Sequence, residues 1–302
     1  MLSTIAPVLF VLVWSTGLVV ARAVVPHASA EMFLFARMAL SAAVLAALAL
    51  SGREPWPRRS QFTMHLLAGA MLHGVYLSAA YWAIGHGMPV GVMSLLGSMQ
   101  PLVSVIALFL MTGERPSSRT VVGLATGIAG VTLVLFPALD GIGHQPITLW
   151  TALIAILAVI GMSVGTLLQR GRLANDGVRV SASVQNAGGA LVALVAMLTS
   201  GSYEWTPSFT LWFSLLWSVL GLSVGATLLI VWMVRAHGVT KMSALLLAVP
   251  GLAAIEAWFL FGERLTVTQI AGFGLALMGV VLARSMAPKR ASGHVSGASG
   301  AR

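Results

Sequence analysis

Long apolar runs, separated by short polar segments, fill almost the whole chain. A helix needs roughly 20 residues to cross a hydrocarbon core of about 30 Å, and each run has about that length. The runs lack the strict alternation of barrel strands, so the pattern favours helices. Ten runs can be read, at residues 4–24, 31–50, 62–84, 88–111, 119–137, 148–169, 180–199, 209–234, 239–261 and 266–283. The pattern therefore predicts an all-α membrane protein with ten transmembrane helices.

The two halves of the chain carry the same motifs at one fixed spacing. The tripeptide Gly113-Glu114-Arg115 returns as Gly262-Glu263-Arg264, a shift of 149 residues (262 − 113 = 149). At that shift, 13 of the 49 ungapped pairs between residues 87–135 and 236–284 are identical. This likeness indicates that the chain is built from two copies of one unit.

Each unit holds five of the ten apolar runs, and this odd number fixes how the units lie. The second unit must enter the membrane inverted with respect to the first. Inverted halves are typical of secondary transporters, whose substrate site lies between the two repeats. We expect a first five-helix repeat in 1–140, a second, inverted one in 141–286, and a disordered cytoplasmic tail in 287–302.

Charge is scarce in this chain, and its placement predicts a topology. Charged residues make up 8% of the sequence, against roughly 25% in soluble proteins. With the N-terminus in the cytoplasm, fourteen Lys and Arg residues fall in inner loops and the tail, whereas outer loops hold Arg22 and Arg264. This split follows the positive-inside rule and predicts cytoplasmic termini in a multi-pass membrane protein. The net charge of +9 thus reflects topology, and we expect no nucleic-acid partner.

The sequence predicts neither an enzyme nor a bound cofactor or metal. The chain has no cysteine, which excludes disulfides and Cys-ligated metals. It has no P-loop, so transport must be gradient-driven or facilitated. Residues 161–165 and 221–225 imitate a nucleophile elbow, but both lie in apolar helical runs, where their glycines suit helix packing. An intramembrane serine hydrolase using Ser163 or Ser223 is the alternative.

Pro101 and Pro250 lie mid-span at equivalent points of the two repeats. Proline removes one backbone donor and frees a carbonyl, which bends a helix. In lipid the freed group must face protein or a wet cavity. A packed kink is the alternative, but the symmetric pair favours a hinge that lines a cavity.

Polar residues precede the first of these prolines. Ser94, Ser98 and Gln100 would project into the cavity, and Ser243 is the repeat mate of Ser94. A serine can bond its hydroxyl to its own helix backbone, which makes each serine a weaker candidate. The amide of Gln100 cannot be satisfied in that way, so Gln100 is the stronger candidate for substrate binding.

Four larger side chains are candidates for the cavity wall. His73 and Tyr76 share one face of the third span near mid-bilayer, and a wet vestibule would supply the partners that buried polar groups need. The alternative is a neutral histidine bonded to a neighbouring helix. Trp14 and Trp217 lie deep, where they wall a substrate pocket or face lipid. We favour the wall for Trp14, because polar residues, beginning with Ser15, follow it.

Charges within the membrane require partners, because an unpaired charge there is costly. A structural pair of Glu256 with Arg264 or Arg22 is favoured over a proton-coupling role of this carboxylate. Arg37, inside the second span, is interpreted as a helix-packing residue and not as a substrate clamp. Glu263 is expected to cap a helix or to pair locally beside Arg264.

Together these motifs resemble the EamA family of the drug/metabolite transporter superfamily. The resemblance extends from about residue 4 to 284, and its motifs occur twice at matching spacing. Its motifs are Trp14-Ser15, Arg37, Pro101 followed by Gly113-Glu114-Arg115, and Pro250 followed by Gly262-Glu263-Arg264.

The resemblance implies a ten-helix carrier with a central cavity, most similar to YddG-type amino-acid exporters. Cavity positions carried over from the family fall on Trp14, His73, Ser98, Gln100 and Ser163. The last three depart from the aromatic residues of some relatives, which suggests a broader or smaller substrate.

The leading hypothesis is therefore a carrier in a bacterial inner membrane that exports amino acids or similar small metabolites by alternating access, with a broad specificity as one option. Its partners would be a small-molecule substrate and the lipid bilayer, and an inverted repeat can work as a monomer. The alternative keeps the fold but exports cationic drugs, quaternary ammonium compounds or other small metabolites. That alternative calls for an acidic residue deep in the cavity, and Glu256 is the candidate.

Overall fold

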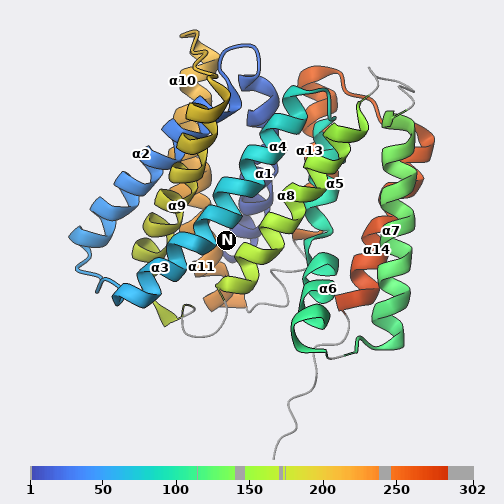
Figure 1. The fold of residues 1–302 in the computed structure, drawn as a ribbon, viewed down its shortest axis with the longest axis horizontal. Helices are drawn as coiled ribbons and strands as arrows, with labels where there is room; N and C mark the ends of the chain where they lie inside the picture. Colours follow the sequence, from blue (N-terminus) through green and yellow to red (C-terminus); the bar gives the residue numbers. More distant parts are fainter. Residues whose placement is uncertain are drawn as a thin grey trace, which may run out of the picture.

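The chain forms a bundle of helices whose connecting loops gather at two opposite ends (Figure 1). The structure is a computed structural model, and it describes residues 2–113, 115–139, 147–169, 173, 175–237 and 246–284. Within these ranges the extended pairing consists of one isolated bridge between Ala28 and Trp205. The all-helical prediction is therefore confirmed for the described residues.

The elements of the first repeat are α1 (Leu2–Val24), α2 (Ala30–Ser51), α3 (Arg59–Gly69), η1 (Ala70–Val75), α4 (Tyr76–Gly85), α5 (Val90–Ser98), α6 (Gln100–Thr112) and α7 (Ser118–Leu139). In this repeat α1, α2 and α7 are continuous helices, and the helical stretches between α2 and α7 are divided into shorter segments. The second repeat follows the same order. Its elements are α8 (Leu149–Leu168), α9 (Val178–Ser200), α10 (Phe209–Leu216), η3 (Trp217–Gly225), α11 (Ala226–His237), α13 (Val249–Phe261) and α14 (Val267–Arg284).

Length and composition make most of these helices able to cross a membrane. Among the described residues, eight helical stretches are long and apolar enough to do so, and two shorter apolar helices, Val249–Phe261 and Val267–Ala283, follow. Large apolar side chains cover the outside of the bundle, with Phe259 80% and Phe209 84% exposed. In water such a surface would be a liability, whereas lipid accommodates it.

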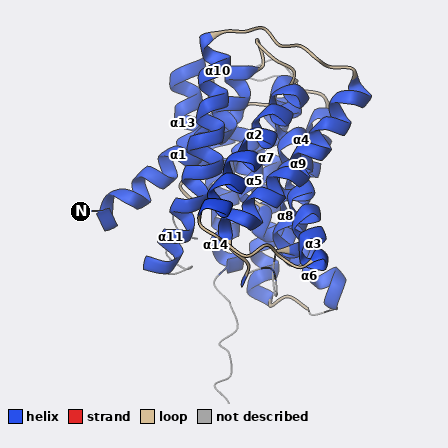
Figure 2. Cartoon of the chain, turned by 90° about the vertical axis from the view of Figure 1, so that its left-hand side faces the viewer, coloured by secondary structure: helices blue, strands red, loops and turns tan. Residues whose placement is uncertain are grey.

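Two π-helical segments, η1 and η3, interrupt equivalent spans of the two repeats. π-helical turns are rare and occur often at functional sites. Each segment lies between two α-helical parts of its span, η1 between α3 and α4 and η3 between α10 and α11. Figure 2 shows the bundle turned by 90°, with α3 and α4 on one side and α10 and α11 on the other. The sequence pattern gave no indication of either segment.

The prolines interrupt their spans more sharply than a bend would. The α-helix ends before Gln100, and α6 starts anew with Pro101 in its first turn; α13 starts in the same way at Pro250. Proline is tolerated there, because the first-turn N–H groups lack helical partners. Both segments end at a left-handed glycine, Gly113 with φ 73° and Gly262 with φ 69°. In both repeats a helix thus starts at the proline and ends at a left-handed glycine, while residues 238–245, ahead of Pro250, lie outside the described residues.

Helix packing also recurs when the repeats are exchanged. α1 packs on α13 as α6 packs on α8, and η1 packs on α9 as η3 packs on α2. The most extensive pair joins the last helices of the repeats, α7 and α14, which stand together at one side of the bundle (Figure 1). Small residues allow this approach: a Cβ on Gly130 would meet the backbone of Ala276, and one on Gly279 the backbone of Gly127.

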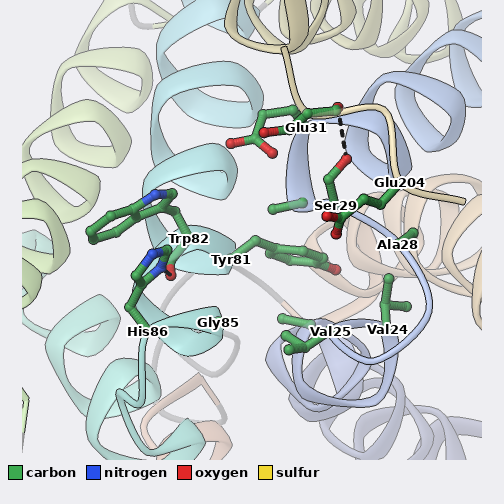
Figure 3. A pocket seen from close by; sticks show the side chains of 13 residues that line it. Val24, Val25, Ala28, Ser29, Glu31, Tyr81, Trp82, Gly85, His86 and Glu204 are labelled. Carbon is green, nitrogen blue, oxygen red and sulfur yellow. Dashed lines mark hydrogen bonds between the residues drawn. The ribbon is translucent and has the colours of Figure 1, made fainter. Parts of the chain in front are cut away.

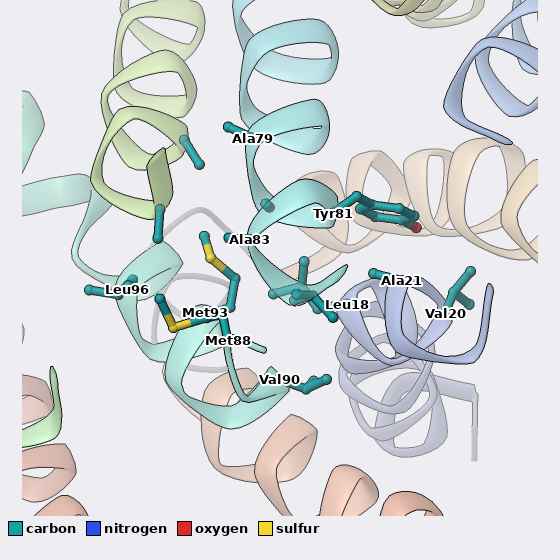
Figure 4. Close-up of a cluster of buried hydrophobic side chains, with 14 of the residues drawn as sticks. Leu18, Val20, Ala21, Ala79, Tyr81, Ala83, Met88, Val90, Met93 and Leu96 are labelled. Atoms are coloured by element: carbon teal, nitrogen blue, oxygen red, sulfur yellow. The ribbon is translucent and has the colours of Figure 1, made fainter. Parts of the chain in front are cut away.

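A cluster of buried apolar side chains fixes α1 against α4 and α5 (Figure 4). Leu18 and Ala21 of α1 meet Tyr81 and Ala83 of α4, with Met93 of α5 beside them. These side chains are at most 7% exposed. The cluster therefore holds rigid the helices that carry the polar residues described next.

Candidate functional site

Two adjoining cavities lie between the repeats, and they share the side chains of Trp14, Leu18, Tyr76 and Met162. Cavity A has a volume of about 120 Å³ and is also lined by Ser15, Ser94, Ser98, Gln100, Pro101 and Pro250. Cavity B has a volume of about 150 Å³ and is also lined by Arg37, His73, Asn186, Leu222, Ser223 and Thr227. Polar and aromatic side chains of both repeats thus converge on one region.

Most residues predicted from the sequence to bind substrate lie at these cavities, although their role in binding stays a prediction. Two predicted residues, Ser163 and Trp217, are not among the described residues that line either cavity. Ser163 is fully buried, and its Oγ lies within hydrogen-bond distance of two carbonyl oxygens, that of Val159 at 2.8 Å and that of Gln100 at 3.2 Å. Ser243 lies outside the described residues.

Trp217 is the first residue of η3, and its indole Nε1 donates to Thr16 Oγ1 at 2.8 Å. It therefore braces η3 against α1 from beside the cavities. The predicted pair of tryptophans is thus divided: Trp14 lines both cavities, and Trp217 supports the helix that carries Trp14.

The polar side chains before Pro101 are partly satisfied on their own helix. Ser98 Oγ donates to the carbonyl of Leu95 at 2.7 Å. Gln100 Nε2 donates to Ser104 Oγ at 3.1 Å, because residues four apart share a helix face. The Gln100 amide thus bonds to a side chain of its own helix, a partner that the sequence did not predict, and not to the helix backbone. Gln100 still lines cavity A, and an amide has further hydrogen-bonding capacity.

Arg37 does more than pack between helices. Its side chain lines cavity B, is 8% exposed, and donates from Nη1 to the Tyr81 hydroxyl at 3.0 Å. Tyr81 in turn donates to the carbonyl of Gly17 at 3.2 Å. Arg37 and Gly17 line cavity B, whereas Tyr81 lines a third cavity. The interpretation of Arg37 as a packing residue therefore has to be extended.

This third cavity, here called the end cavity, has a volume of about 310 Å³ (Figure 3). Tyr81 forms part of its floor, and the stacked rings of Trp82 and His86, 3.7 Å apart, form one side. Glu31 and Glu204 contribute carboxylates to its lining. The Arg37–Tyr81–Gly17 connection thus separates cavity B from a space at one end of the bundle.

Glu256 forms neither of the ion pairs expected for it. Its Oε1 lies 2.6 Å from Ser15 Oγ, and its buried Oε2 finds no hydrogen-bond partner among the described residues. Arg22 Nε lies 3.9 Å from Glu263 Oε1. The reason is register: α1 and α13 pack so that Ser15 meets Glu256, and Arg22, two turns further on, meets Glu263. The predicted pairing of Glu256 with Arg22 is therefore wrong, and among the described residues no salt bridge joins Glu256 to Arg264.

Glu263 was expected to cap a helix or pair locally, but its carboxyl group contacts a helix start of the other repeat. It accepts a hydrogen bond from the backbone N–H of Val90 at 2.8 Å, at the start of α5. Burial raises the pKa of the Glu263 carboxyl above its ordinary value, although the Val90 N–H and the Arg22 guanidinium act in the opposite direction. This contact joins the end of α13 to the start of α5.

Polar contacts also tie the opposite end of the bundle, and the sequence reading missed them. Arg179 Nε lies 3.6 Å from Glu54 Oε1, and the buried His65 Nε2 lies 2.9 Å from Asp176 Oδ2. Gln61 Nε2 donates to Asp176 Oδ1 at 3.2 Å. These contacts fasten α3 and the loop after α2 to the start of α9. The central cavities thus lie between two ends that are each closed by polar contacts.

Comparisons with known proteins agree with this architecture. A profile of the EamA-like transporter family matches residues 2–136 and 149–285. A solved crystal structure of a protein with 22% sequence identity superposes with a TM-score of 0.59, covering 93% of this chain and 96% of the other. That likeness concerns the fold. A comparison with curated proteins gives no significant match.

Proposed function

The chain belongs to the EamA-like transporter family, and on this premise we propose that it exports amino acids as a secondary carrier. Members of this family are membrane transporters of the drug/metabolite superfamily. The proposal places the chain in a bacterial inner membrane, with ten crossings, opposed repeats and both termini in the cytoplasm. A similarity to YddG-type exporters in the choice of substrate is part of the same proposal.

The pair of adjoining cavities between the repeats carries this proposal. Their volumes, about 120 and 150 Å³, are below the roughly 300–1,000 Å³ of pockets for drug-sized ligands. Small metabolites therefore suit the site better than bulky drugs. The mixture of an apolar wall with a few convergent polar groups is also typical of small-molecule sites.

The two cavities offer complementary chemistry for an amino acid. In cavity B the Arg37 guanidinium is a natural partner for a carboxylate, because it has five donors and its bond to Tyr81 uses one. In cavity A the oxygens of Gln100 and Ser94 can accept from an ammonium group. Trp14 stands between both spaces and can pack against a side chain.

Alternating access follows from the way the ends are closed. The Arg37–Tyr81–Gly17 connection would serve as the gate towards the end cavity, and its opening would join that cavity to cavity B. The breaks before Pro101 and Pro250 would be the hinges, because a helix interrupted by proline lacks backbone bonds that resist bending. The basic loops would place the gate on the outer side.

Uptake of labelled amino acids into proteoliposomes tests the proposal. The wild-type protein is expected to give flux above protein-free vesicles, and Gln100→Leu is expected to reduce it. Phe259→Leu is the matched control, because Phe259 is 80% exposed on the lipid-facing surface. Absence of protein-dependent flux for every amino acid tested would refute the substrate class.

Export of cationic compounds is the second candidate, and the buried, unpaired Oε2 of Glu256 favours it. Ser15 lies between Glu256 and cavity A, so the carboxylate would act on a cation through a rearranged site. Drug-resistance assays in cells separate the two proposals. Loss of resistance to quaternary ammonium compounds in Glu256→Gln, with proton-driven accumulation of amino acids retained, would favour the cationic cargo.

A further inference from the structure

We propose that Glu256, held by Ser15, is the proton-binding site through which a proton gradient drives this carrier. The proposal rests on the proposed function insofar as a substrate must move through cavities A and B. The site itself is argued from the contact between α1 and α13. It assigns to Glu256 a protonated state in the conformation described.

The hydroxyl of Ser15 has two acceptors within reach but one hydrogen to donate. Its Oγ lies 3.0 Å from the carbonyl oxygen of Leu12 and 2.6 Å from Glu256 Oε1. If Glu256 were ionised, Ser15 would donate to it, and the 3.0 Å approach of Ser15 Oγ to the Leu12 carbonyl, which the α1 backbone already serves, would hold no hydrogen. If Glu256 carries a proton, it donates to Ser15 Oγ, and Ser15 donates to Leu12. The protonated carboxyl therefore satisfies both short contacts at once.

The surroundings of Glu256 also disfavour a negative charge. Its Oε2 is buried, and no Lys, Arg or His nitrogen among the described residues lies within salt-bridge distance of either oxygen. A buried carboxylate without a counter-ion is far more costly than a buried neutral carboxyl group.

The charged groups near Glu256, in sequence or on the helices packed against α13, either contact another charged residue or lie beyond the helix end. On α1 the basic residue is Arg22, which faces Glu263 two turns away from Ser15. α5, the other helix packed on α13, carries no titratable side chain. Arg264 follows in the loop after α13 and is exposed. Glu256 is therefore the membrane-embedded carboxyl group of this interface.

The contact is placed where protonation can be coupled to the cavities. Ser15 lines cavity A beside Trp14, and α13 reaches the same cavity through Pro250 at its other end. Loss of the proton would leave a bare carboxylate between α1 and α13, which must then separate to admit water. Proton release thus favours an open α1–α13 interface, and proton binding favours the packed one described here.

Infrared spectroscopy of the purified full-length protein tests the site without any substrate. The carbonyl stretching band of a protonated carboxyl group is expected near neutral pH in the wild type and in Glu263→Gln, the matched control on the same chain segment. It is expected to be lost in Glu256→Gln, whose amide can still donate to Ser15 Oγ and so preserves the contact. A wild-type spectrum without a component that Glu256→Gln removes would overturn the proposal.

Transport in proteoliposomes tests the coupling. With one proton exchanged per substrate, one pH unit can drive about a tenfold concentration ratio of labelled amino acid in the wild type. Glu256→Gln is expected to give a ratio near one while retaining counterflow, in which substrate exchanges without net proton movement. Glu256→Asp, which keeps a titrating group, is expected to restore part of the accumulation.

Two further results would decide between the proposals. Accumulation by Glu256→Gln equal to that of the wild type would overturn the proton site even if the infrared band is found. If the wild type moves no amino acid in counterflow but shows the Glu256-dependent band, the proposed substrate class fails and the proton site stands.

Discussion

The broken span of the first repeat, α5 with α6, and its counterpart around α13 share a backbone but not a chemistry. Both start a new helix at a proline and end at a left-handed glycine. At the common shift of 149 residues, Gln100 corresponds to Val249 and Ala107 to Glu256. The first repeat thus places its polar groups before and after the break, and the second places one carboxyl group two turns beyond it.

This difference shows how two repeats with the same backbone can take on different functions. Identical breaks give both halves the same freedom to bend, which alternating access around a central site needs. Side chains are freer to diverge, because each repeat contributes different walls to the same cavities. In our proposals the first repeat recognises the substrate through Gln100, and the second handles the proton through Glu256.

The largest effect is expected when a glutamate is placed at Ala107, the position of the first repeat that is equivalent to Glu256. Ala107→Glu introduces a charge in mid-span without the serine that serves Glu256, and such a charge costs about 2.5–3.5 kcal/mol by insertion scales. Thermal or denaturant unfolding of the purified protein measures the loss. Ala107→Gln is the matched control of equal size, and an equal loss in both variants would show that volume and not charge is responsible.

The second largest effect is expected when Gln100 of the first repeat is replaced by valine, the residue at the equivalent position 249 of the second repeat. Gln100→Val leaves a substrate group unpaired in cavity A, which is worth about 1–3 kcal/mol. The KM for amino-acid counterflow should therefore rise by about one order of magnitude. The reciprocal change, Val249→Gln, is the control, because it alters the lining of the same cavity and leaves Gln100 in place. A larger rise of the KM in Val249→Gln than in Gln100→Val would contradict the assignment.

A smaller effect is expected at the proposed gate. Tyr81→Phe removes the hydroxyl that joins Arg37 to Gly17, and a hydrogen bond of this kind contributes about 0.5–1.5 kcal/mol. The population open to the end cavity should rise severalfold.

Accessibility labelling measures this change, because the chain has no native cysteine. A single cysteine at Ala21, which lines the end cavity and is 1% exposed, should react faster in the Tyr81→Phe background. Tyr203→Phe is the control at a 53% exposed position. Equal acceleration in both backgrounds would argue against a gate at Tyr81.

Much of the fold follows from the sequence because its determinants are local. Apolar run length predicts membrane helices, and the paired prolines mark the two breaks. The η1 and η3 segments escape such a reading, because a π-helical turn inserts a residue into a helix whose apolar periodicity looks unchanged. That insertion determines which way a residue such as Trp217 points, and Trp217 meets Thr16 instead of lining a cavity.

The site was predictable in its residue types and less so in its pairings. Trp14, His73 and Gln100 were predicted because they are polar or bulky side chains deep in apolar spans, where a polar group requires a hydrogen-bond partner. The partners of Glu256 were not, because they depend on the register between α1 and α13. A shift of two helical turns decides whether Glu256 meets Ser15 or Arg22, and sequence spacing within each helix does not contain that information.

The smallest effect concerns the end of α13, where Glu263 joins α5 and faces Arg22. Burial holds the pKa of Glu263 above its ordinary value of 4.5, so folding favours the protonated carboxyl. The stability that this preference contributes is present below pH 4.5 and is lost as the pH rises through the raised pKa.

Glu263→Gln cannot ionise, yet its side-chain oxygen can still accept from Val90. Compared with the wild type, it should therefore be equally stable in acid and slightly more stable at neutral pH. The gain should stay below about 1 kcal/mol, because Arg22 is exposed and offsets part of the loss. Thermal unfolding at a series of pH values gives the difference curve. A Glu263→Gln protein that is less stable than the wild type at neutral pH would reverse the sign and show that the Arg22 contact outweighs burial at this helix end.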